Sequence, residues 1–138
     1  MIVNEKSFVI GGTLKQLMLD KLSEEDLNEW TVTIKRKNRG NSSNFSGTCF
    51  KLGKHIILRF KDRNLFTTIS TKDCHGNDIP AFKNFDEQVY WLFLHEVWHA
   101  HVAHNNLPRL KRIEEKMANW FATKNYLVSA SEKQGAQQ

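Results

Sequence analysis

Cysteine is scarce in this sequence of 138 residues: Cys49 and Cys74 form neither a C-x-x-C motif nor a disulfide framework. No apolar run approaches the length of about 18 residues that a membrane-spanning helix needs. No charged N-terminus followed by an apolar segment marks a secretion signal. These absences predict a cytoplasmic protein with free thiols and no membrane association.

The composition is that of an ordinary globular protein, with 40% hydrophobic and 25% charged residues. The length suits one domain, which we expect at residues 1–128, followed by a flexible polar tail at residues 129–138. A net charge of +5 favours an acidic partner or a nucleic acid. The basic segments 35–39 and 109–116 are candidates for nucleic-acid contact, and a solvated protein surface is the alternative.

The first half of the chain predicts a helix and a small antiparallel sheet. Leucine and methionine residues at helical spacing predict a helix to about residue 22, with Thr13 as its cap. Alternation of polar and apolar residues predicts a strand at residues 30–34. Two more strands, at 45–52 and 55–61, flank Gly53-Lys54, which suits a two-residue type II′ turn.

The second half predicts two helices after an irregular segment. Residues 62–83 show no regular pattern, and a segment of this length is expected at the rim of a cleft. Asn84 is a preferred helix cap, and Glu87 completes a capping box. The helix at 85–104 is apolar on nearly all sides, so we expect it at the centre of the fold. Pro108 suits the first position of a second helix, which we expect to end near residue 128.

The central helix carries His95, Glu96 and His99, which form an H-E-x-x-H motif. Helical residues four apart share a face with Cβ atoms about 5–6 Å apart, so both imidazoles can bind one Zn²⁺. The neighbouring glutamate can accept a proton from a metal-bound water. The alternative is that these three side chains only form hydrogen bonds with one another and with the sheet.

Glu115 is the predicted third ligand. The central helix descends about 9 Å from His99 to residue 105, and the next helix climbs about 10 Å back to Glu115. Small residues on the same face, Ala118 and Ala122, allow the two helices to approach closely. Asn119 on that face is expected to form a hydrogen bond with a ligand histidine. An exposed acid in a charged helix is the alternative for Glu115.

Three other residues are weaker candidates for the third ligand. His104 is about 140° round the helix from His99, and His101 is nearly opposite His99. Glu114 is one position away from the face that bears Ala118 and Asn119.

The motif His95-Glu96-x-x-His99, followed by Glu115-x-x-Ala118-Asn119-x-Phe121-Ala122, resembles the ImmA/IrrE-type metallopeptidases and the broader small gluzincins. The resemblance covers residues 85–125. It implies an α+β, minimal zincin-like fold, in which an N-terminal helix and a small antiparallel sheet pack on the two helices. It also implies a zinc ion held by the histidines and by the glutamate of the second helix. This chain has Trp98 where the family often has glycine, and it shows no helix-turn-helix domain.

A looser resemblance links the hairpin at residues 45–60 to SprT-like proteases, which act on DNA-bound proteins. In that family the third zinc ligand is a later histidine, and this chain has no histidine after His104.

Together these features predict a zinc metalloprotease that hydrolyses protein or peptide substrates, with Glu96 as the general base. The substrate is expected to add as a strand along an exposed sheet edge, for which residues 55–61 are the candidate. Tyr126, His75 and His55 are candidates for stabilising the carbonyl oxygen. The alternative is a catalytically silent protein of zincin fold that acts as a binding or regulatory module and associates with nucleic acid.

Overall fold

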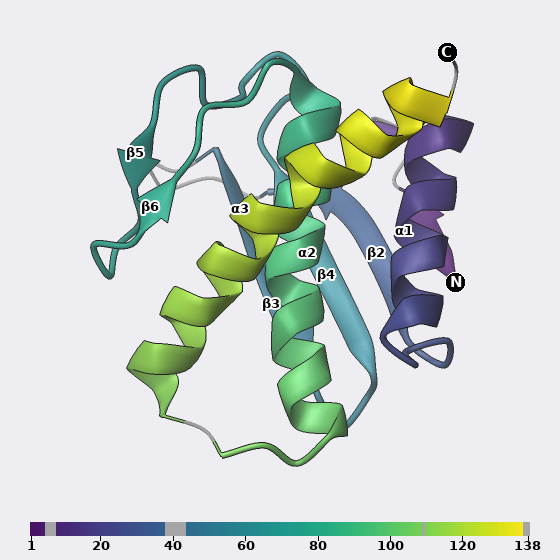
Figure 1. Cartoon of the computed structure of the whole chain (residues 1–138), viewed down its shortest axis with the longest axis vertical. Helices are drawn as coiled ribbons and strands as arrows, with labels where there is room; N and C mark the ends of the chain where they lie inside the picture. The colour runs from purple at the N-terminus through teal and green to yellow at the C-terminus, as the bar shows by residue number, and fades with distance from the viewer. Residues whose placement is uncertain (5–7, 38–43, 109, 137–138) are drawn as a thin grey trace.

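The computed structural model describes residues 1–4, 8–37, 44–108 and 110–136, with side chains described as far as Tyr126 (Figure 1). The fold is α+β, as predicted. The described residues form three helices and six strands: β1 (Ile2–Asn4), α1 (Gly12–Glu24), β2 (Thr31–Arg36), β3 (Phe45–Phe50), β4 (His55–Phe60), β5 (Thr71–Lys72), β6 (Asp78–Ile79), α2 (Phe85–His104) and α3 (Lys111–Ala136). No helix in these ranges is long and apolar enough to cross a membrane.

The main sheet is mixed, so the prediction of an antiparallel sheet was wrong. Its strand order is β1-β2-β4-β3; only β3 and β4 are antiparallel, while β1 with β2 and β2 with β4 are parallel. Helix α1 returns the chain along the sheet between β1 and β2, which makes these two strands parallel. The hairpin then places β4 between β2 and β3, and β3 becomes an edge strand.

Two local predictions at chain turns were also wrong. The turn between β3 and β4 spans residues 51–54, because the last strand pair joins Phe50 and His55. The positive φ of 50° falls on Lys54 and not on Gly53, so the turn is not a two-residue type II′ turn. Helix α1 begins at Gly12 with Gly11 as its cap residue, and Thr13 therefore lies inside the helix.

Helix α2 lies at the centre of the fold, as predicted. The Asn84 side chain accepts a hydrogen bond of 2.9 Å from the Glu87 N–H and caps the helix. The Glu87 carboxylate accepts from the N–H of Lys83, one residue before the cap. Thirteen of the twenty residues of α2 are buried, because the sheet covers one side of the helix and α3 crosses the other (Figure 1).

Helix α3 is shifted relative to its predicted range. It begins at Lys111, and the Glu114 N–H donates to the Leu110 carbonyl at 2.9 Å, so Pro108 lies before the helix and not at its first position. The backbone stays helical to Ala136, beyond the expected end near residue 128. Ala118 and Ala122 are fully buried. The sequence predicted that these small residues allow α3 to approach α2 closely. The flexibility of the tail stays a prediction.

Candidate metal centre

The three predicted metal ligands lie together between α2 and α3. One ligand atom from each of His95, His99 and Glu115 lies within 4.8 Å of the others. The Nε2 atoms of the two histidines are 3.3 Å apart. The Glu115 carboxylate places Oε2 3.3 Å from His95 Nε2 and Oε1 3.2 Å from His99 Nε2. The helical hairpin therefore brings the glutamate level with the histidines, as the helix geometry predicted.

These distances fit a small divalent metal ion. Around a tetrahedral zinc with metal–nitrogen bonds of about 2.0–2.1 Å, neighbouring ligand atoms lie about 3.3–3.4 Å apart. Two imidazole nitrogens and one carboxylate also match the donor set of catalytic zinc sites, which leave the fourth position for water. The residues present therefore suit a zinc ion, and the hydrogen-bonded cluster without metal stays the alternative.

Glu96 lies beside this cluster with its side chain buried against β3. Its Oε2 is 3.7 Å from His95 Nε2. Burial raises the pKa of the Glu96 carboxyl above its ordinary value, while the nearby His95 and His99 act in the opposite direction. Gly47 of β3 allows this placement, because a Cβ there would lie 2.6 Å from the Glu96 Oε2. Only the tertiary structure reveals the role of this glycine.

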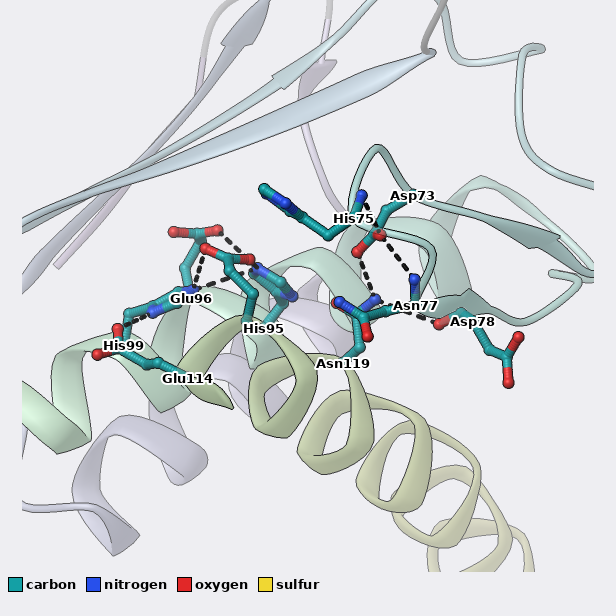
Figure 2. Close-up of polar contacts among 10 residues, drawn as sticks. Asp73, His75, Asn77, Asp78, His95, Glu96, His99, Glu114 and Asn119 are labelled. Carbon is teal, nitrogen blue, oxygen red and sulfur yellow. Dashed lines mark hydrogen bonds and ion pairs between the residues drawn. The ribbon is translucent and has the colours of Figure 1, made fainter. Parts of the chain in front are cut away.

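Glu114, which the sequence offered only as a weaker candidate for the third ligand, is a residue of this site in a different position. Its buried carboxylate forms a hydrogen bond with the Nδ1 of His99, the ring nitrogen that faces away from the cluster (Figure 2). Since consecutive helical residues are rotated by about 100°, Glu114 and Glu115 reach different nitrogens of one imidazole. The two adjacent acidic residues, Glu114 and Glu115, are the sequence feature that could have indicated this second contact. A carboxylate in this position holds a ligand histidine in one orientation.

The charges of the cluster depend on one another. Burial lowers the pKa of His99, but hydrogen bonds with Glu115 and Glu114 and the charge of Glu96 outweigh burial and raise this pKa to about 9. Hydrogen bonds from His95 and His99 hold the pKa of Glu115 well below its ordinary value. At neutral pH and without a metal ion, His99 is thus protonated and Glu115 is negatively charged.

Hydrogen bonds from Asn119 of α3 join this helix to the small β5–β6 hairpin. Its side-chain amide donates to Asp73 Oδ2 at 2.9 Å and to the Asp78 carbonyl at 3.2 Å (Figure 2). Its Oδ1 and the Nδ1 of His95 are both buried without a hydrogen-bond partner in the described part of the chain. The hydrogen bonds that the structure shows therefore go to the hairpin, and the expected contact with a ligand histidine stays a prediction.

The rival ligands point elsewhere, as expected from their positions on α2. His101 Nδ1 lies 3.1 Å from the carboxylate of Glu25, and His104 Nε2 lies 3.4 Å from that of Asp26. Both interactions join the end of α2 to the end of α1.

Of the three candidates for stabilising the carbonyl oxygen, only His75 lines the cleft above the cluster. It projects from the β5–β6 turn toward the space over His95 and Glu96 (Figure 2). His55 forms a hydrogen bond of 2.7 Å with Thr33, and the Tyr126 hydroxyl donates to the Ala81 carbonyl. Neither of these two lines the cleft.

The cluster of His95, His99 and Glu115 opens into a cleft of about 1420 Å³. Residues of β3, α2 and α3 line the cleft, together with residues of the β5–β6 hairpin. The segment 62–83 thus contributes to a cleft rim, as predicted. The edge strand along the cleft is β3, so the prediction that residues 55–61 offer the free edge was wrong, because β4 pairs on both sides.

The first basic segment is partly packed into the fold. Lys37 is buried, and the Arg36 guanidinium lies 5.6 Å from the centre of the Phe8 ring. Residues 38 and 39 lie outside the described ranges, as does Arg109 of the second segment. In that segment Lys111, Arg112 and Lys116 are exposed. Association with nucleic acid stays a prediction.

Comparison of the chain with protein-family models, curated proteins and solved structures finds no match in any of the three. The described structure is thus that of a small α+β protein with a cluster of two histidines and a glutamate that suits a metal ion. The resemblance to ImmA/IrrE-type metallopeptidases rests on the sequence motifs alone.

Proposed function

We propose that this protein is a zinc-dependent metallopeptidase of the H-E-x-x-H gluzincin type. One observation carries the proposal: His95, His99 and Glu115 converge at the spacing of tetrahedral ligands on the floor of an open cleft. The buried carboxylate of Glu96 lies directly beside them. His95, His99 and Glu115 would hold the zinc ion, which would supply polarisation of the scissile carbonyl and acidification of a water.

Glu96 is the general base in this proposal. Burial raises the pKa of the Glu96 carboxyl toward neutral pH. A group with a pKa near the working pH can both accept a proton and release it. The carboxylate takes a proton from the attacking water and delivers it to the leaving amine. General acid–base catalysis of this kind contributes about 10²–10⁴-fold.

Strand β3 and His75 hold the substrate. The Lys61 N–H donates to the Asn44 carbonyl, so the backbone of Asn44 faces β4. Backbone polar groups alternate in direction along a strand, and Gly47 is three residues further on. The N–H and C=O of Gly47 therefore face away from β4. An extended peptide can add beside β3 as a further strand and so cross the metal cluster. The imidazole of His75, which projects toward the space over the cluster, is the proposed donor to the carbonyl oxygen.

The test compares the wild type with Glu96→Gln and Glu115→Ala. Purified proteins are assayed for zinc content and for cleavage of a mixed peptide library by mass spectrometry. We expect Glu96→Gln to retain zinc and lose hydrolysis, and Glu115→Ala to lose zinc. Undiminished cleavage by Glu96→Gln would refute the proposed mechanism, and equal zinc in Glu115→Ala would remove Glu115 as a ligand.

The same preparations test the alternative of a binding module. Salt-sensitive binding to DNA, together with no cleavage by the zinc-loaded wild type, would favour a catalytically silent protein.

A further inference from the structure

Two lysines line one end of the cleft. Lys51 directly follows β3, and Lys111 is the first residue of α3. In Figure 1 the β3–β4 turn and the start of α3 both lie toward the lower end of the molecule, away from the β5–β6 hairpin. The two lysines therefore reach the cleft from different elements, at the end away from the β5–β6 hairpin.

Neither lysine forms an ion pair within the described part of the chain. Lys72 at the hairpin differs, because its ammonium lies 2.6 Å from Asp78. The acidic residues that line the cleft already have interactions: Asp73 with Asn119, Glu114 with His99, Glu115 with both histidines and Glu96 with His95. The cleft thus keeps positive charge at one end.

The distance from each lysine to the candidate metal ligands corresponds to the length of a few residues of an extended peptide substrate. Lys111 precedes Glu115 by one helical turn, or about 6 Å along the axis of α3. Lys51 follows Gly47, the neighbour of Glu96, by four residues, or about 13 Å along an extended chain. A bound strand advances about 3.3 Å per residue, so the backbone positions of both lysines correspond to substrate positions about two to four residues from the reacting bond.

We propose that the cleft selects peptides that carry a carboxylate about two to four residues from the scissile bond, held between Lys51 and Lys111. This inference rests on the proposed peptidase function and names its substrate class. Lysine ammonium groups on flexible stems can follow a carboxylate without a fixed geometry. An acidic side chain and a free C-terminal carboxylate share this chemistry, and the experiment below distinguishes them.

The test measures binding of short alanine-based peptides to the zinc-loaded Glu96→Gln variant by fluorescence anisotropy. The peptides carry glutamate, glutamine or lysine at the relevant positions and have amidated C-termini. We expect the glutamate peptide to bind about tenfold more tightly than its glutamine counterpart, with a preference that shrinks at high salt. Adding Lys51→Ala and Lys111→Ala should abolish the preference, whereas Lys15→Ala on the exposed side of α1 should leave it intact.

Equal binding of the glutamate and glutamine peptides would overturn the proposal, as would a preference that survives removal of both lysines. A glutamine peptide with a free C-terminus that binds as tightly as the amidated glutamate peptide would identify the terminal carboxylate as the ligand. Cleavage of all peptides by the wild type is measured in parallel. Cleavage without acidic preference overturns only this inference, whereas no cleavage of any peptide contradicts the peptidase function itself.

Discussion

Gly47 of β3 lies directly against Glu96 of α2, so closely that a Cβ on Gly47 would meet the Glu96 carboxylate oxygen at 2.6 Å. The edge strand of the sheet therefore sets the position of the proposed general base. A side chain at this point would have to displace the carboxylate or separate the strand from the helix.

Replacing Gly47 with alanine should reduce hydrolysis without releasing zinc. The added methyl group pushes the Glu96 carboxylate away from its position, and displacement of a catalytic group by about 1 Å can cost about 10²-fold in rate. The rate constant kcat and the zinc content of Gly47→Ala are the measurements. Gly53→Ala is the matched control, because nothing lies within 4 Å of its added Cβ. Wild-type kcat in Gly47→Ala would show that the contact does not position the base.

Glu114→Gln should weaken zinc binding while the fold is kept. The glutamine keeps the shape of the side chain but removes the charge that orients and polarises His99 through its Nδ1. We expect a loss of about 10–100-fold in zinc affinity, measured by competition with a chromophoric chelator. Glu115→Gln should lose more affinity, because it removes a ligand. Glu24→Gln on α1 serves as control, and an affinity loss in this control equal to that of Glu114→Gln would remove the special role of Glu114.

Without metal, the stability of the protein should fall as the pH rises from about 6.5 through about 9. The pKa of His99 is raised to about 9, so its protonated form stabilises the fold fully below its ordinary value of 6.5. Glu115 has a lowered pKa, so its contribution is present above its ordinary value of 4.5 and disappears only at strongly acid pH. Urea unfolding with a chelator, at about pH 6 and about pH 9.5, measures this change. His99→Gln should reduce the difference, and an unchanged difference would contradict the assignment.

Asn119→Ala should destabilise the fold through the β5–β6 hairpin. The substitution removes two hydrogen bonds to the hairpin and leaves the carboxylate of Asp73 with fewer donors. Loss of buried hydrogen bonds costs about 1–3 kcal/mol in the free energy of unfolding. Denaturant unfolding measures this cost, and hydrogen exchange should show faster opening of the hairpin. If zinc affinity falls about 10–100-fold instead, Asn119 acts through a ligand histidine, as the sequence first suggested.

Much of the metal cluster followed from helical periodicity. Residues four apart on one helix share a face whatever surrounds them. The formation of α2 therefore suffices to bring His95 and His99 together. The position of Glu115 level with the two histidines follows from the rise per residue of two antiparallel helices. The cap at Asn84 and the buried surface of α2 were also local properties of the sequence.

The tertiary structure alone decided what surrounds this cluster. Strand order depends on how distant segments pair, so the sequence could not show that β4 is internal and that β3 offers the edge beside the cleft. The approach of Gly47 to Glu96 and the attachment of Asn119 to the hairpin join residues far apart in the chain. By itself the sequence determined the pattern of candidate metal ligands on the two helices, since that pattern repeats with the helical turn. Which side chains enclose the candidate metal centre, and where lysines line the cleft, depended on the packing of the sheet and the hairpin against those helices.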